Sequence, residues 1–168
     1  MIAEIPSPGQ VRQPANRAVG VASPYEQIRM AFANARSEAL SLYIGTKSAI
    51  WYMTGSDGLK CDALLREHAN QLFDTTDALT ERLRGFTGEL IDHCEFANCM
   101  RVDDIDFVTP EKLLNRLRLE NQILTGALRT VCILGRQTSD ASEERSLEVW
   151  IHEARERAWS LQEAMRFT

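Results

Sequence analysis

Apolar residues recur at alternating spacings of four and three positions in two long stretches of the chain. The first stretch follows Ser23-Pro24 and has apolar or small residues at Ile28, Phe32, Ala35, Ala39, Leu42, Thr46, Ala49 and Met53. The last follows the polar break at 137–140, with Leu147, Ile151, Ala154, Ala158, Leu161 and Met165. This spacing places each set on one face of a helix packed in a bundle. The pattern therefore predicts one long helix near each end of the chain.

Two further helices are predicted between them. Ser56 or Asp57 offers an N-cap for the second, whose apolar face carries Leu65, His68, Leu72, Leu79 and Leu83 before Gly85 closes it. Thr109-Pro110-Glu111 starts the third, which carries Leu113, Leu117, Ile123, Leu124, Leu128, Val131 and Leu134 and ends near Gly135. His68, between two leucines, is interpreted as a core or interface histidine. Trp51, Trp150 and Trp159 are interpreted as packing anchors.

The remaining segments complete the predicted architecture. Residues 1–23 contain three of the five prolines and no apolar period, which indicates an extended or mobile arm. Residues 88–106 read as a crossover connection with a short helix near 91–99. No stretch shows sustained two-residue alternation, so strands are not expected. Residues 24–168 are therefore predicted to form one all-α domain, an antiparallel four-helix bundle of ferritin-like plan.

Composition adds limits on function. The net charge is −5, so the molecule as a whole is not expected to attract nucleic acid or anionic lipid. Four cysteines without a CxxC pair favour reduced thiols in a cytoplasmic protein over a disulfide framework. No apolar run approaches the roughly 20 residues of a membrane span.

A family resemblance rests on Lys47, Trp51 and Gly55, followed by Asp77, Glu81 and the glycine-containing turn after Arg84. Together with the last helix, which runs from Ser139-Asp140-Ala141 to Trp159-Ser160-Leu161, these residues resemble the Dps-type mini-ferritins. The resemblance covers roughly residues 24–166. It implies a hollow homo-oligomeric shell of twelve subunits that oxidises and stores iron in the stress response, with ferroxidase centres between two subunits.

Carried over position by position, the resemblance gives a degenerate iron centre. The two histidine positions hold Ile50 and Asp62, and an aspartate position holds Arg66. Asp77 and Glu81 match. Asp62 and Arg66 are spaced i,i+4 with the acid first, which favours an ion pair. We therefore expect Arg66 to replace the metal electrostatically, pairing with Asp62 and with Asp77 or Glu81. Two alternatives stay open, namely a solvated charged face and an intact iron site.

Two further sites follow from the same resemblance. Asp140, Glu143 and Glu144 are candidates for an iron entry pore, although acidic residues also complement the dipole at a helix N-terminus. Arg12 and Arg17 are the candidates for DNA contact, and two cations predict weak or absent binding. The expected function is iron sequestration and oxidative-stress protection with ferroxidase activity weakened or lost. The alternative is a structural or binding shell or dimer without iron chemistry.

Overall fold

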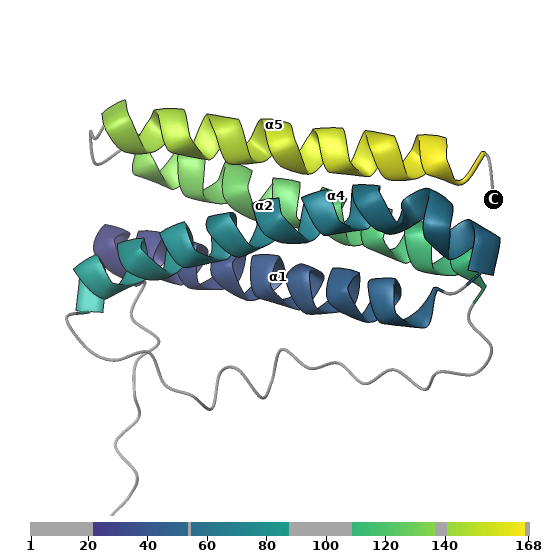
Figure 1. Ribbon diagram of the computed structural model, residues 1–168. Coiled ribbons are helices and arrows are strands. Elements are labelled where there is room, and N and C mark those ends of the chain that lie inside the picture. Colours follow the sequence, from purple (N-terminus) through teal and green to yellow (C-terminus); the bar gives the residue numbers. More distant parts are fainter. Residues whose placement is uncertain (1–21, 54, 88–108, 137–140, 167–168) are drawn as a thin grey trace, which may run out of the picture.

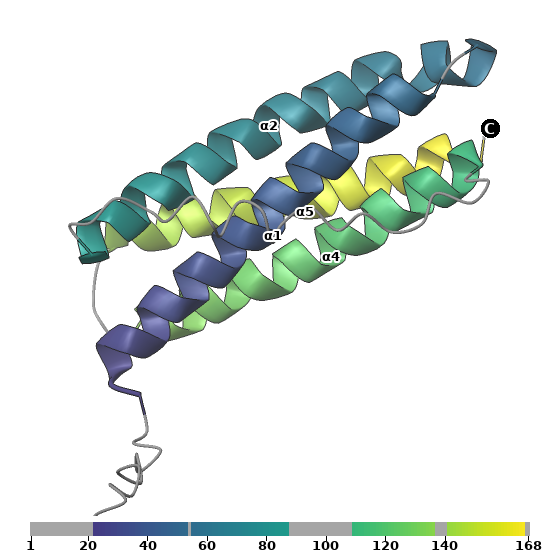
Figure 2. The same ribbon diagram turned by 90° about the horizontal axis from the view of Figure 1, so that it is seen from below.

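The computed structural model describes residues 22–53, 55–87, 109–136 and 141–166. Within these ranges the chain forms four helices: α1 (Pro24–Tyr52), α2 (Gly55–Thr87), α4 (Pro110–Gly135) and α5 (Ala141–Ala164). They lie side by side as an elongated bundle (Figures 1 and 2). Helix α1 packs extensively on α2 and α4, and α4 packs extensively on α5, whereas α2 and α5 contact each other at few positions. The predicted all-α four-helix bundle is confirmed.

The starts of two helices follow from their cap residues. Ser23 Oγ accepts a hydrogen bond from the Glu26 amide at 3.2 Å, and Glu26 Oε2 accepts one from the Ser23 amide at 2.9 Å. This reciprocal capping box satisfies two amide groups that no helical carbonyl can reach. Thr109 caps α4 in the simpler way, accepting from the Lys112 amide at 3.3 Å. Pro24 and Pro110 occupy the first turns, where no amide hydrogen is needed.

The bounds of α2 differ from the predicted ones. The helix begins at Gly55, just before the expected caps, a displacement within the range over which helix ends are defined. It continues past Gly85 to Thr87. Phe86 explains the extension, because its ring packs against Tyr25 at 5.3 Å and against Phe32 at 5.5 Å between centroids. Its carbonyl also accepts a hydrogen bond from the Tyr25 hydroxyl at 2.7 Å. These contacts outweigh the low helix propensity of glycine.

The core consists of leucines from all four helices around Phe32. Its least exposed members are Phe32, Leu42, Leu65, Leu72, Leu79, Leu114, Leu124, Leu128, Val131, Leu147 and Leu161. Two predictions about packing were wrong. Ile123 was placed on the apolar face of α4 but is 55% exposed, because it lies about 100° around the helix from the buried Leu124, whereas Leu114, outside the predicted set, is buried. Trp51 and Trp159 are 71% and 61% exposed, so neither anchors the core of this chain.

A buried polar network crosses the bundle between α2, α4 and α5. Arg157 is 1% exposed and donates from Nε to Asn121 Oδ1 at 2.9 Å and from Nη1 to Gln71 Oε1 at 3.1 Å. Beside it, His68 Nε2 lies 3.1 Å from Ser160 Oγ. His68 is therefore a core histidine with a polar partner, as predicted. The sequence pattern gave no sign of the buried arginine, which is set among the small and apolar positions of α5.

Two further expectations concern the cysteines and membranes. Cys61 and Cys132 are buried and are not joined by a disulfide, whereas Cys94 and Cys99 lie outside the described residues, so the redox state of the four cysteines stays a prediction. No helix in the described ranges is both long and apolar enough to span a bilayer. Residues 1–21 of the N-terminal arm expected over 1–23, and the short helix expected near 91–99, also lie outside the described residues.

Candidate metal centre

The charged residues singled out on α2 share one face of that helix. At 100° per residue, Asp62, Arg66, Asp77 and Glu81 fall within about 100° of one another. Leu65 and Leu72 lie on the other side of the helix and are buried in the core. The apolar side of α2 therefore fixes the direction in which the charged face points, which is away from the bundle interior.

The ion pair predicted between Asp62 and Arg66 is present. Arg66 Nε lies 2.7 Å from Asp62 Oδ2, and the two side chains are 59% and 41% exposed for arginine and aspartate respectively. The hydrogen bond from Arg66 lowers the pKa of the Asp62 carboxyl below its usual value. The same bond raises the pKa of Arg66. Asp62 is thus held ionised with its charge already balanced by a guanidinium.

The additional contact expected from Arg66 to Asp77 or Glu81 does not form within one chain. Eleven residues of helix separate Arg66 from Asp77, which is about 16 Å along the axis and far beyond a salt bridge. Glu81 instead accepts from Arg84 Nη1 at 2.8 Å, with both side chains about three-fifths exposed. One chain therefore divides the expected ligand set into two separate groups along α2.

Ile50, at the first lost histidine position, has an apolar role. Its side chain is partly buried and packs against the hydrophobic core. Trp51 follows Ile50, and Nζ of Lys47 lies 5.7 Å from the centroid of its ring, a cation–π contact on the surface of α1. This end of the face offers an alkyl group and an aromatic ring, and neither is a ligand for a hard cation.

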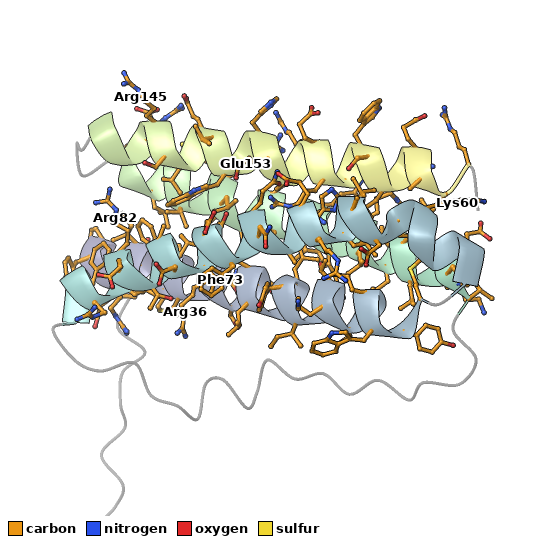
Figure 3. The ribbon with its side chains drawn as sticks, viewed as in Figure 1. Arg36, Lys60, Phe73, Arg82, Arg145 and Glu153 are labelled. Atoms are coloured by element: carbon orange, nitrogen blue, oxygen red, sulfur yellow. The ribbon has the colours of Figure 1, made fainter. Side chains whose placement is uncertain are left out.

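Phe73 is a member of this face that the sequence reasoning missed. It lies between the Asp62–Arg66 pair and Asp77, and its side chain is 56% exposed. Its ring packs against Tyr43 of α1 with centroids 5.9 Å apart, and Figure 3 shows it directed toward α1. Counting 100° per residue from Asp62 would have placed position 73 within the charged sector. An exposed aromatic ring there indicates a contact surface.

Within one chain, the residues on the charged face of α2 do not form a site for a metal ion. Across the described residues, no three His, Cys, Asp or Glu side chains come together in a group that could hold a metal. A guanidinium also occupies the position next to Asp62, and its positive charge opposes the approach of Fe(II). The arrangement can bind a carboxylate-bearing or aromatic surface more readily than a cation.

Of the other predicted site residues, only the side chain of Glu144 lies in the described part of the chain. Glu144 Oε1 accepts from Arg136 Nε at 2.8 Å, so its charge is balanced by the residue that follows α4. Asp140, the side chain of Glu143, and the two arginines of the arm, Arg12 and Arg17, lie outside the described residues. An acidic pore and a basic arm therefore stay predictions.

Comparisons with known proteins concern the fold. No family model matches the sequence, and a comparison with curated proteins found no match. Among solved structures, Dps from Thermosynechococcus elongatus superposes with a TM-score of 0.74 at 15% identity, covering 83% of this chain and 90% of that one. Antigen TpF1 from Treponema pallidum gives 0.74 at 18% identity, covering 88% and 98%.

A third solved structure superposes almost equally well on the chain. The Dps protein of Vibrio cholerae O1, described as a member of a broad superfamily of ferritin-like diiron-carboxylate proteins, gives a TM-score of 0.71 at 18% identity. It covers 83% of this chain and 89% of that one. At these identities the comparison establishes the arrangement of the helices. It does not establish whether this chain has metal ligands. The chain has the Dps-type, ferritin-like fold.

Proposed function

We propose that the chain is a Dps-like protein that assembles into a hollow homo-oligomeric shell, sequesters iron and protects against oxidative stress, with ferroxidase activity weakened or lost. The observation that carries the second half of this proposal is the Asp62–Arg66 ion pair at 2.7 Å. It places a fixed cation where the resemblance expects a ligand. The fold supports the first half.

Exposed apolar side chains support self-association. Large hydrophobic residues with roughly half or more of their surface exposed lie on all four described helices, and they include Met30, Trp51, Phe73, Ile133 and Val149. A monomer that left these side chains in water would lose the free energy of burying them, so we expect them to be covered by neighbouring subunits. Shells of twelve subunits are the expected form.

Assembly also changes what the charged face of α2 can do. A second copy of α2, running antiparallel across a twofold axis, would bring its Asp77 and Glu81 toward the Asp62–Arg66 pair of the first. Arg66 would then balance carboxylates from both copies. The face would hold the subunits together without a metal ion, which accounts for retention of Asp77 and Glu81 beside lost histidines.

Iron retention tests this proposal. Purified protein is incubated with Fe(II) and hydrogen peroxide, separated by size-exclusion chromatography with light scattering, and analysed for iron in each fraction. We expect ferric iron to elute with an assembly close to twelve subunits in mass. A monomeric or dimeric protein, or a shell that carries no more iron than an unrelated control protein, would contradict it.

A second candidate is a shell or dimer with a structural or binding role and no iron chemistry. The balanced charge of the Asp62–Arg66 pair favours it, because an occupied site needs no ion. The same fractions separate the two candidates, since an assembled but iron-free shell supports the second. For either one, DNA binding is expected to be weak or absent at ~150 mM salt, and a gel shift measures it.

A further inference from the structure

A groove of about 450 Å³ lies between α4 and α5, on residues that the candidate metal centre does not use. Its lining comes from one stripe of each helix: Arg118, Gln122, Thr125 and Arg129 from α4, and Arg155, Ala158, Trp159 and Gln162 from α5. The lining therefore combines three guanidinium groups, two amides, a hydroxyl and an indole. Grooves of this volume accommodate small molecules of nucleotide size.

None of the three arginines of the groove forms an ion pair with a carboxylate of the described residues. Elsewhere, Arg66, Arg84, Arg116, Arg136 and Arg166 each pair with a carboxylate at 3.0 Å or less. In the groove, Arg118 donates from Nε and Nη2 to the neutral Asn115 Oδ1. Over the residues that the structure describes, Arg129 and Arg155 hydrogen-bond to no carboxylate. The groove is thus a local positive site on a chain whose net charge is −5.

The register of the two helices orders these groups along the groove. The bonds from Arg157 to Asn121 and from Arg136 to Glu144 fix which residues of the antiparallel helices are level. Trp159 then lies level with the turn between Arg118 and Gln122, and Arg155 lies level with Thr125. Arg129 follows one turn further, about 6 Å along the axis. An aromatic platform with amides therefore occupies one end, and two free guanidinium groups occupy the other.

We propose that this groove binds a nucleoside polyphosphate. The indole of Trp159 is 61% exposed and can stack on a base, while Gln122 and Gln162 can hydrogen-bond to its edge. The guanidinium groups of Arg155 and Arg129 have the fork geometry that phosphate oxygens accept in pairs. A monophosphate would engage one of these cations, and a chain of phosphates engages both. The site does not depend on iron chemistry or on the charged face of α2.

Calorimetric titration of the full-length protein with ATP, without divalent cations and at ~150 mM salt, tests the site. Adenosine and inorganic triphosphate serve as partial ligands. We expect ATP to bind more tightly than either one. Trp159→Ala should weaken ATP about ten-fold and leave triphosphate binding unchanged, because only the base stacks. Arg155→Gln and Arg129→Gln should each weaken both anions by about ten-fold or more.

Arg145→Gln is the matched control, because it makes the same charge change on an exposed residue of α5 outside the groove, directed away from the bundle (Figure 3). It should leave ATP affinity within about two-fold of the wild type. The substituted groove side chains are exposed or half-buried, so thermal melts should match the wild type and separate lost binding from lost folding. Absence of ATP binding, equal affinity for ATP and triphosphate, or an equal loss in Arg145→Gln would each overturn the proposal.

Discussion

A single charge decides what the face of α2 can bind. Asp62 by itself is an oxygen ligand suited to a hard cation. With Arg66 Nε at 2.7 Å, the carboxylate is already neutralised, and a metal ion would have to displace the guanidinium to reach it. At Ile50 the change is simpler, since an alkyl side chain packed on the core offers no lone pair. At the three positions where the resemblance expects ligands, Asp62 and Arg66 thus act through their charges, and Ile50 acts through the loss of a donor atom.

His68 gives a prediction at the same scale. Ser160 donates its hydroxyl hydrogen to the Arg157 carbonyl at 3.0 Å, so Ser160 Oγ accepts from His68 Nε2, and the buried imidazole is neutral. Burial, helped by the positive charge of Arg157, lowers the pKa of His68 from 6.5 to about 4. Between these values the unfolded chain binds a proton that the folded chain does not, so the folded state loses stability as pH falls from 6.5 to 4.

The size of this effect follows from the shift. Chemical denaturation should show the free energy of unfolding falling by up to about 3 kcal/mol from pH 7 to pH 4 through this group. His68→Gln should remove that part of the pH dependence. His152→Gln, at an exposed position on α5, is the matched control and should keep it. An unchanged pH profile in His68→Gln would show that the imidazole is not the group responsible.

At the scale of elements, the sequence predicted the helices well where local chemistry determines them. The Ser23 and Thr109 caps with their following prolines set the starts of α1 and α4, and Gly135 marks the end of α4. Prediction was poorer at Gly85, because the contact of Phe86 with Tyr25 depends on residues 61 positions apart. The exposed Trp51 and Trp159 were misassigned for a related reason. Apolar character does not distinguish the core of one chain from a surface available to a partner or ligand.

The Ser23 cap gives a prediction for α1. Ser23→Ala removes the hydroxyl that accepts from the Glu26 amide and leaves the Ser23 amide in place. It should lower the free energy of unfolding by about 1 kcal/mol in urea denaturation. Ser23→Asp should retain most of the stability, because its carboxylate can also accept from the Glu26 amide. Ser48→Ala, at an exposed position inside the same helix, is the control and should cost nothing measurable. Equal losses in Ser23→Ala and Ser48→Ala would exclude capping as the cause.

The whole bundle is packed unevenly, and the polar network lies at its most sparsely packed edge. Helices α2 and α5 contact each other little, and among their links are the bonds from Arg157 to Gln71 and between Ser160 and His68. Burial lowers the pKa of Arg157 to about 10. Within the described part of the chain, its Nη2 has no hydrogen-bond partner. The charge of Glu153 offsets only part of the cost of burial, and the side-chain acceptors of Arg157 are neutral amides, so each hydrogen bond that Arg157 makes contributes strongly to stability.

Substitutions at Gln71 test the role of this network. Gln71→Leu leaves Nη1 of Arg157 without its acceptor and should lower the free energy of unfolding by about 2 kcal/mol. Gln71→Glu supplies a carboxylate to the buried guanidinium and should be at least as stable as the wild type at pH 7. Gln162→Leu, at an exposed position, provides the control for the glutamine-to-leucine change. If Gln71→Glu were the less stable of the two variants, the account of Arg157 as an undercompensated cation would be wrong.

We propose that the chain keeps a Dps-type fold while Arg66 takes the place of a metal ion. Aerobic Fe(II) oxidation followed optically tests it most directly, comparing the wild type, the variant Ile50→His/Asp62→His/Arg66→Asp and a protein-free solution. Circular dichroism and light scattering confirm that the variant folds and assembles as the wild type does. We expect the wild type to oxidise iron no faster than the protein-free solution and the triple variant to oxidise it faster. A wild type that accelerates oxidation, or a folded and assembled triple variant that does not, would contradict it.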